Sequence, residues 1–98
     1  METFEVVVDE AGRGELRLLV EGVQAGKMDI LIRQDKLTVF HTEVDESHEG
    51  KGFAKLLLQE LVAKARAENL KIKPLCPYVH AQFKRHPDEY ADVWSKSL

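Results

Sequence analysis

His41 and Cys76 are the two residues whose side chains and predicted positions in this chain best suit chemistry. A histidine side chain has a pKa near neutrality, so it can accept a proton at working pH. A cysteine can donate a proton or, as the thiolate, act as a nucleophile. His41 lies in the segment VFHTEV and Cys76 ends the segment KIKPLC. Their chemistry therefore depends on whether the fold brings these two strand-like segments together.

The segment at residues 37–44 is predicted to be a strand, whose side chains alternate between two faces. One face is expected to carry Val39, His41 and Glu43, and the other Phe40, Thr42 and Val44. His41 and Glu43 would then lie about 7 Å apart along the strand. The imidazole and the carboxylate are expected to point the same way.

Three earlier strands are predicted at residues 4–9, 15–20 and 27–33, separated by turn residues that include AGRG and EGVQAG. Connections this short join antiparallel neighbours, so the four strands form a meander. From Gly52 the apolar residues recur with a spacing close to 3.6, which predicts a helix that Asn69 ends in a left-handed conformation. A fifth strand at residues 71–76 and one or two short helices, within 78–85 and 87–94, complete the chain.

This order predicts one α+β domain over residues 1–98, with a four-stranded antiparallel meander, a crossover helix, a fifth strand and a C-terminal helix. A strand, a crossover helix and a following strand normally become parallel neighbours, so the fifth strand lies beside the fourth. His41 and Cys76 are then on adjacent strands, and we expect their side chains on the same side of the sheet. Pro74 donates no ladder hydrogen bond and is expected where these two strands part.

The composition favours an ordinary soluble domain. Acidic residues outnumber basic ones 17 to 14 with the signs interleaved, which gives no basic field for nucleic acid and no cationic face for a membrane. The N-terminus is unlike a signal peptide, and no apolar run is long enough to span a bilayer. The single cysteine excludes an internal disulfide, fits a reducing cytoplasm and, with four histidines, is too sparse for a zinc site. The chain is expected to be a monomer or a homodimer.

The sequence EGKGFA precedes the long helix and has the composition of an anion-binding loop. Glycines at 50 and 52 let the backbone approach a ligand closely. The unpaired N–H groups and the dipole of the next helical turn favour a negative group there, and Lys51 adds a flexible charge. On the glycines alone, a tight turn between strand and helix is an equally good interpretation.

The stretch EGKGFAKLLL resembles the pyrophosphate-binding segment of GCN5-related N-acetyltransferases, whose pattern is Gln/Arg-x-x-Gly-x-Gly/Ala. Gly52 and Ala54 occupy the two small positions, while Glu49 stands where glutamine or arginine is usual. With FHTEV before the loop and PLCPYVHAQFKRHPDEYADV after it, nearly the whole chain resembles the very small members of this superfamily.

This resemblance implies a site for acetyl-CoA. The pantetheine arm would lie between the fourth and fifth strands and pair with the backbone of Thr42, Glu43 and Val44. The pyrophosphate would sit on the backbone amides of Glu49, Gly50, Lys51, Gly52, Phe53 and Ala54.

The resemblance also implies catalytic roles in acetyl transfer to an amine. His41 would be the general base and Cys76 either the acid that protonates the CoA thiolate or a nucleophile that His41 activates. Tyr78 is the nearest match to the tyrosine acid of larger relatives. The acceptor stays open among a polyamine, an amino sugar, a protein terminus and a lysine.

Two other functions fit the sequence. The chain could be a module that binds CoA without turnover, because no obvious extra segment forms an acceptor pocket. It could also be a purely structural domain in which the glycines only make turns and Cys76 is a small buried hydrophobe.

Overall fold

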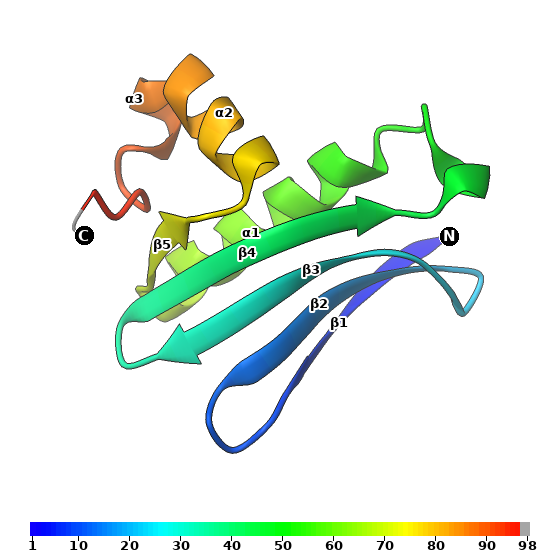
Figure 1. Ribbon diagram of the computed structural model, residues 1–98, viewed down its shortest axis with the longest axis horizontal. Coiled ribbons are helices and arrows are strands. Elements are labelled where there is room, and N and C mark those ends of the chain that lie inside the picture. The colour runs from blue at the N-terminus through cyan, green and yellow to red at the C-terminus, as the bar shows by residue number, and fades with distance from the viewer. Residues whose placement is uncertain (97–98) are drawn as a thin grey trace.

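Four long strands form an antiparallel meander in the computed structural model, which describes residues 1–96, and a short fifth strand extends the sheet (Figure 1). The strands are β1 (Glu2–Val8), β2 (Arg13–Val20), β3 (Val23–Arg33), β4 (Lys36–Val44) and β5 (Lys71–Pro74). The helices are the 3-10 turn η1 (Glu46–His48), α1 (Phe53–Glu68), α2 (Pro77–Arg85) and α3 (Pro87–Tyr90). The sheet order is β1-β2-β3-β4-β5, with β5 parallel to β4, which confirms the predicted α+β topology.

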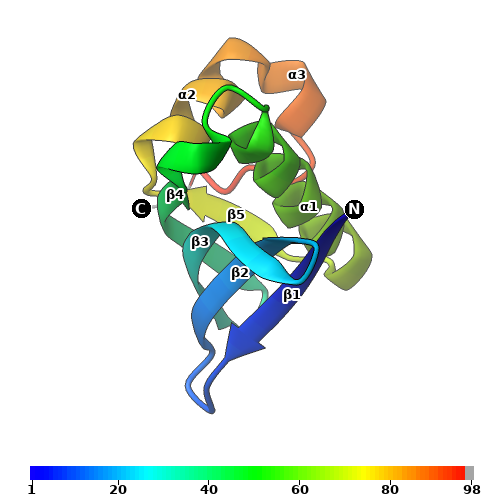
Figure 2. The ribbon, with the colours of Figure 1, turned by 90° about the vertical axis from the view of Figure 1, so that its right-hand side faces the viewer.

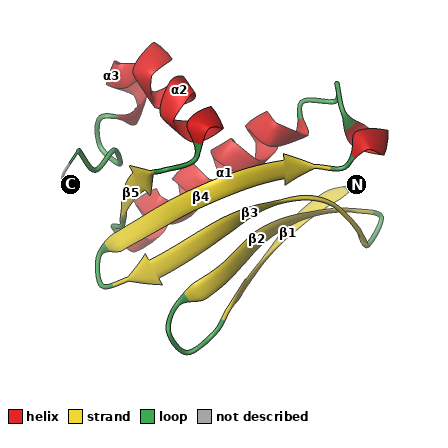
Figure 3. Cartoon of the chain, viewed as in Figure 1, coloured by secondary structure: helices red, strands yellow, loops and turns green. Residues whose placement is uncertain are grey.

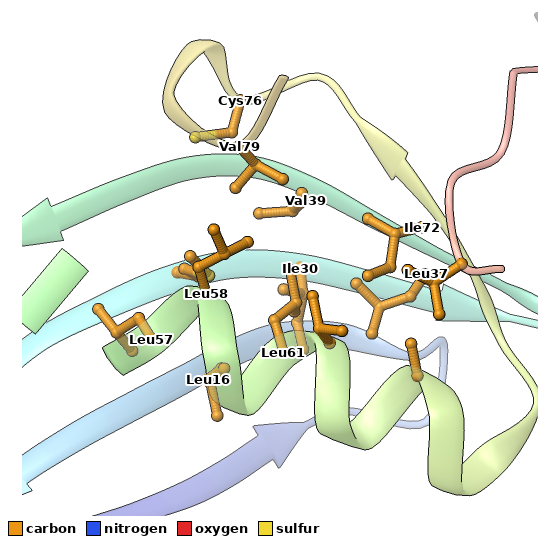
Figure 4. Close-up of a cluster of buried hydrophobic side chains, with 14 of the residues drawn as sticks. Leu16, Ile30, Leu37, Val39, Leu57, Leu58, Leu61, Ile72, Cys76 and Val79 are labelled. Atoms are coloured by element: carbon orange, nitrogen blue, oxygen red, sulfur yellow. The ribbon is translucent and has the colours of Figure 1, made fainter. Parts of the chain in front are cut away.

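Helix α1 covers one face of the sheet, and no helix of the described residues lies on the other face (Figures 1 and 2). Its apolar side meets the strands in one cluster of buried side chains (Figure 4). Labelled members of that cluster include Leu16, Ile30, Leu37, Leu57, Leu58 and Leu61. Helix α1 ends where predicted, at Asn69, whose φ of 56° is left-handed. The end of helix α1 at Asn69 therefore sets where the chain enters β5 beside β4.

Gly26 was expected in a connection, but it lies inside β3 and faces α1. A Cβ atom at this position would lie 2.9 Å from the carbonyl oxygen of Glu43 and 3.3 Å from Leu57 Cδ1. Because only glycine leaves room there, α1 can approach the end of β4 closely. The third strand is therefore longer at its start than the sequence predicted.

The C-terminal segment returns to β5. Residues 93–95 lie beside β5, since the Ile72 N–H donates to the Val93 carbonyl (2.6 Å) and the Ser95 N–H donates to the Ile72 carbonyl (2.8 Å). The prediction of a helix through residue 94 is therefore wrong for its last turn, because α3 ends at Tyr90. Among residues 1–96 there is no helix that could span a lipid bilayer.

We expect Leu61→Ala to lower the free energy of unfolding by about 2–5 kcal/mol, because the side chain is fully buried and its removal leaves a cavity. Urea denaturation followed by circular dichroism measures this change. The control is Gln59→Ala, on the exposed side of the same helix, which is expected to stay within about 0.5 kcal/mol of the wild type. Equal effects of the two substitutions would contradict the packing described here.

Candidate functional site

The ladder between β4 and β5 is short. Residues 36–39 pair with residues 71–74, and the last contact is the Cys76 N–H donating to the Val39 carbonyl at 2.9 Å. Beyond it the chain turns into α2, whose first residue is Pro77. Within the described part of the chain, residues 40–44 have no strand partner on their β5 side. We call residues 40–44 the open edge of β4, and their position confirms that the strands part at Pro74.

A β-bulge at Phe40 sets the direction of the side chains along this open edge. In the register between β3 and β4, Asp29 pairs with His41 and Ile30 pairs with Val39, so Phe40 has no partner of its own. The extra residue shifts the alternation by one position. Val39 is buried in the core, whereas His41 points to the helix-free face. The prediction that Val39 and His41 share a face is therefore wrong.

His41 and Glu43 do share a face, as predicted, and they interact. His41 Nε2 lies 3.2 Å from Glu43 Oε1, and the His41 side chain is 54% exposed. Asp29, the strand partner of His41, carries a carboxylate on the same face and is paired with Lys27. The imidazole thus stands at the open edge of β4 among carboxylates, in reach of solvent.

Cys76 lies on the opposite side of the sheet, in the buried cluster with Val39 and Val79 (Figure 4). It is 2% exposed, and its Sγ is 3.2 Å from Thr42 Oγ1. Thr42 pairs with the buried Met28, which places its side chain on the α1 face. The sulfur therefore adjoins the open edge of β4 on the α1 face of the sheet.

His41 and Cys76 consequently flank the same stretch of strand from opposite faces. The expectation that the imidazole and the thiol share one side of the sheet is wrong, and the bulge at Phe40 is the physical reason. The polar partner of the thiol is the Thr42 hydroxyl, which the sequence analysis considered only for its backbone. The available signal was a hydroxyl residue directly after the catalytic candidate His41 on the predicted strand.

Tyr78 is half-buried near Cys76, in the first turn of α2. Burial raises the pKa of its phenol, and the nearby Cys76 thiol raises that pKa further in its charged form. The phenol therefore stays protonated well above neutral pH and keeps a proton that it can donate.

The loop between β4 and α1 lies at the far end of the open edge (Figure 3). It lines a hollow of about 300 Å³. Gly50 and Gly52 have φ values of 81° and 76°, and a Cβ atom at either would meet no atom within 4 Å. Gly52 is the N-cap of α1 and no side chain caps the helix, so the first amides of α1 are not used by a side chain. The lining residues are Val44, His48, Glu49, Gly50, Gly52, Phe53 and Ala54.

Six of the residues predicted for the cofactor thus line one hollow, whereas Thr42, Glu43 and Lys51 lie outside it. The hollow also includes His48, which is not among the residues predicted for the cofactor. Its ring stacks on Phe53 with 5.5 Å between the ring centroids. An aromatic residue directly before a glycine-rich loop was the signal for it.

Known proteins share the sequence pattern and the fold of this chain. The family described as GCN5-related N-acetyl-transferase matches residues 4–93. A search of curated proteins gives no match. Among solved structures, a GCN5-like putative N-acetyltransferase from Staphylococcus aureus is 24% identical, with a TM-score of 0.65 over 96% of this chain and 90% of that one.

Two longer proteins share the fold at lower identity. The ribosomal-protein-S18-alanine N-acetyltransferase from Escherichia coli is 14% identical, with a TM-score of 0.67 over 76% of this chain and 66% of that one. The PaiA N-acetyltransferase from Thermoplasma acidophilum, solved in complex with coenzyme A, is 12% identical, with a TM-score of 0.58 over 80% of this chain and 50% of that one. This chain therefore spans less than two thirds of either protein.

The matched residues include nearly the whole sheet, the glycine loop and the helices α1, α2 and α3. The chain belongs to the GCN5-related N-acetyl-transferase family, whose cofactor is acetyl-CoA.

Proposed function

We propose that this protein transfers the acetyl group of acetyl-CoA to an amine. The observation that carries the proposal is the continuity between the glycine loop and the open edge of β4. A diphosphate on the amides of residues 49–54 leads directly onto an unpaired strand edge. The five residues 40–44 span about 17 Å, along which an extended pantetheine arm pairs with the backbone of Thr42, Glu43 and Val44.

The thioester then stops where the strands meet, next to Val39 and Cys76. The acceptor amine attacks the thioester carbonyl from the helix-free face, where His41 stands. The C–N bond forms, the C–S bond breaks, and His41 takes the proton that the amine loses. Glu43, 3.2 Å from the imidazole, stabilises its protonated form.

On the α1 face of the sheet, the CoA sulfur either receives a proton as it leaves or is first replaced on the acetyl group by the sulfur of Cys76. The Cys76 thiol can give its proton to the CoA thiolate, with Tyr78 as a second donor on α2. Alternatively, Cys76 attacks the thioester first, and CoA leaves with the thiol proton. The opposite faces of His41 and Cys76 disfavour direct activation of the thiol by the imidazole, so Thr42 is the partner available to the sulfur.

A CoA-binding module without turnover is the second candidate. The separation of His41 from Cys76, and the 2% exposure of the thiol, favour it over a preformed catalytic pair. The glycine loop and the open edge support cofactor binding equally well in both cases. Turnover experiments therefore have to distinguish them.

We expect Gly52→Ala to weaken CoA binding about tenfold or more, because a left-handed alanine costs about 1–2 kcal/mol and its methyl group occupies the diphosphate position. Isothermal titration calorimetry measures the dissociation constant. The matched control is Gly22→Ala, in the turn between β2 and β3, which has a similar φ of 81° and equally open surroundings. If both variants bind CoA as the wild type does, the glycine loop does not hold the diphosphate.

We expect His41→Gln to lower kcat for acetyl transfer by about a hundred- to ten-thousandfold, while CoA affinity stays unchanged, because the base acts only on the amine. Free-thiol release measured over a panel of amines reports the rate, with the exposed His86→Gln as control. Wild-type activity in His41→Gln would contradict the role of the base.

Cys76→Ala is expected to lower kcat while leaving CoA binding intact. Intact-mass spectrometry after incubation with acetyl-CoA separates its two roles. An acetyl mass on the wild type that disappears in Cys76→Ala assigns the nucleophile, and its absence assigns the acid. An unchanged rate in Cys76→Ala would exclude both roles.

A further inference from the structure

A second hollow, of about 460 Å³, lies beside β5 and is separate from the glycine loop. Its volume is in the range of small-molecule sites. It is formed where β5 ends, where α2 begins and where the C-terminal segment returns. The lining residues are Lys73, Pro74, Leu75, His80, Trp94, Ser95 and Lys96. We call this hollow the β5 pocket.

The β5 pocket combines an apolar floor with a cationic rim. Leu75 is 52% exposed, although large apolar side chains are usually buried, and Trp94 supplies an aromatic wall. Lys96 Nζ lies 4.6 Å from the centre of the Trp94 ring. Neither Lys73 nor Lys96 forms an ion pair within residues 1–96, and none of the lining residues is acidic. Such a pocket favours a ligand with an apolar body and a carboxylate.

The β5 pocket begins at the residues where the ladder between β4 and β5 stops. Pro74, in its lining, pairs with Val39, and Lys73 pairs with Thr38. His41 lies three residues along β4 from Thr38, which corresponds to about 10 Å. The pocket and the exposed imidazole therefore flank the position proposed for the thioester.

The charges at these two places have opposite signs. On the side of His41, the Asp29 carboxylate is already paired with Lys27, so the Glu43 carboxylate, which is 57% exposed, is the one that attracts an ammonium group. The β5 pocket carries the two lysines, which attract an anion. A ligand that satisfies both has an amine at one end and a carboxylate several bonds away, because a free α-amino acid is too short to reach both.

We propose that the acceptor is an amine that also carries a carboxylate and an apolar group, and that the β5 pocket binds its carboxylate end. That the ligand is an acceptor rests on the proposed acetyl transfer. Binding of the ligand in the β5 pocket does not depend on that proposal. Trp94 is the only tryptophan of the chain, so its fluorescence reports occupancy of the pocket in the absence of CoA.

The test uses the dipeptide Gly-Phe and its C-terminal amide, which differ only in the carboxylate. We expect the dipeptide to change the Trp94 fluorescence and to bind about tenfold more tightly than the amide. The double variant Lys73→Gln/Lys96→Gln is expected to lose this preference. Lys84→Gln, which removes an exposed lysine of α2 outside the pocket lining, is the matched control and should keep it.

Acetylation rates complete the test. In the double variant we expect KM for Gly-Phe to rise about tenfold while KM for acetyl-CoA is unchanged. Equal binding of the dipeptide and the amide, equal behaviour of the double variant and Lys84→Gln, or no fluorescence change would overturn the inference. Failure of the proposed function has a different signature, since the wild type would then bind no CoA, or bind it without acetylating any amine, whatever the fluorescence shows.

Discussion

The stop in the hydrogen-bond ladder between β4 and β5 is the constraint on which the candidate site depends. Pairing ends at Val39 and Pro74, and the chain then turns into α2 after one last contact from the Cys76 N–H. A strand edge with free N–H and C=O groups is costly in a folded protein unless a ligand or solvent satisfies it. The same edge ends at the glycine loop, so an extended ligand with a charged end fits the fold without distorting it.

The bulge at Phe40 determines how chemistry can be arranged around that edge. It turns His41 and Glu43 to the helix-free face and leaves Thr42 facing Cys76. In the proposed reaction, a thioester held between the strands has proton-transfer groups on two sides, one for the incoming amine and one for the departing sulfur. The helix-free face leaves the approach of the amine open, which makes the acceptor's own shape and charge important for selection.

Much of the fold could be predicted from the sequence, because hydrophobic spacing changes at Gly52 and turn residues separate the strands. The crossover helix, its end at Asn69 and the parting of strands at Pro74 follow from local signals and are confirmed. The bulge could not be predicted, because an extra residue at Phe40 does not change the alternation of apolar and polar residue types in the sequence. The pocket of Leu75 and Trp94 depends on contacts between distant segments, which no local pattern records.

We propose that CoA lies along the open edge of β4 with its diphosphate on the glycine loop. Amide hydrogen exchange followed by NMR, with and without CoA, measures it most directly. CoA bound in this way is expected to slow exchange or shift resonances at residues 40–44 and 49–54, and to leave the amides of β1 and β2 unchanged. CoA binding that leaves these two segments unaffected, and instead perturbs another surface, would contradict it.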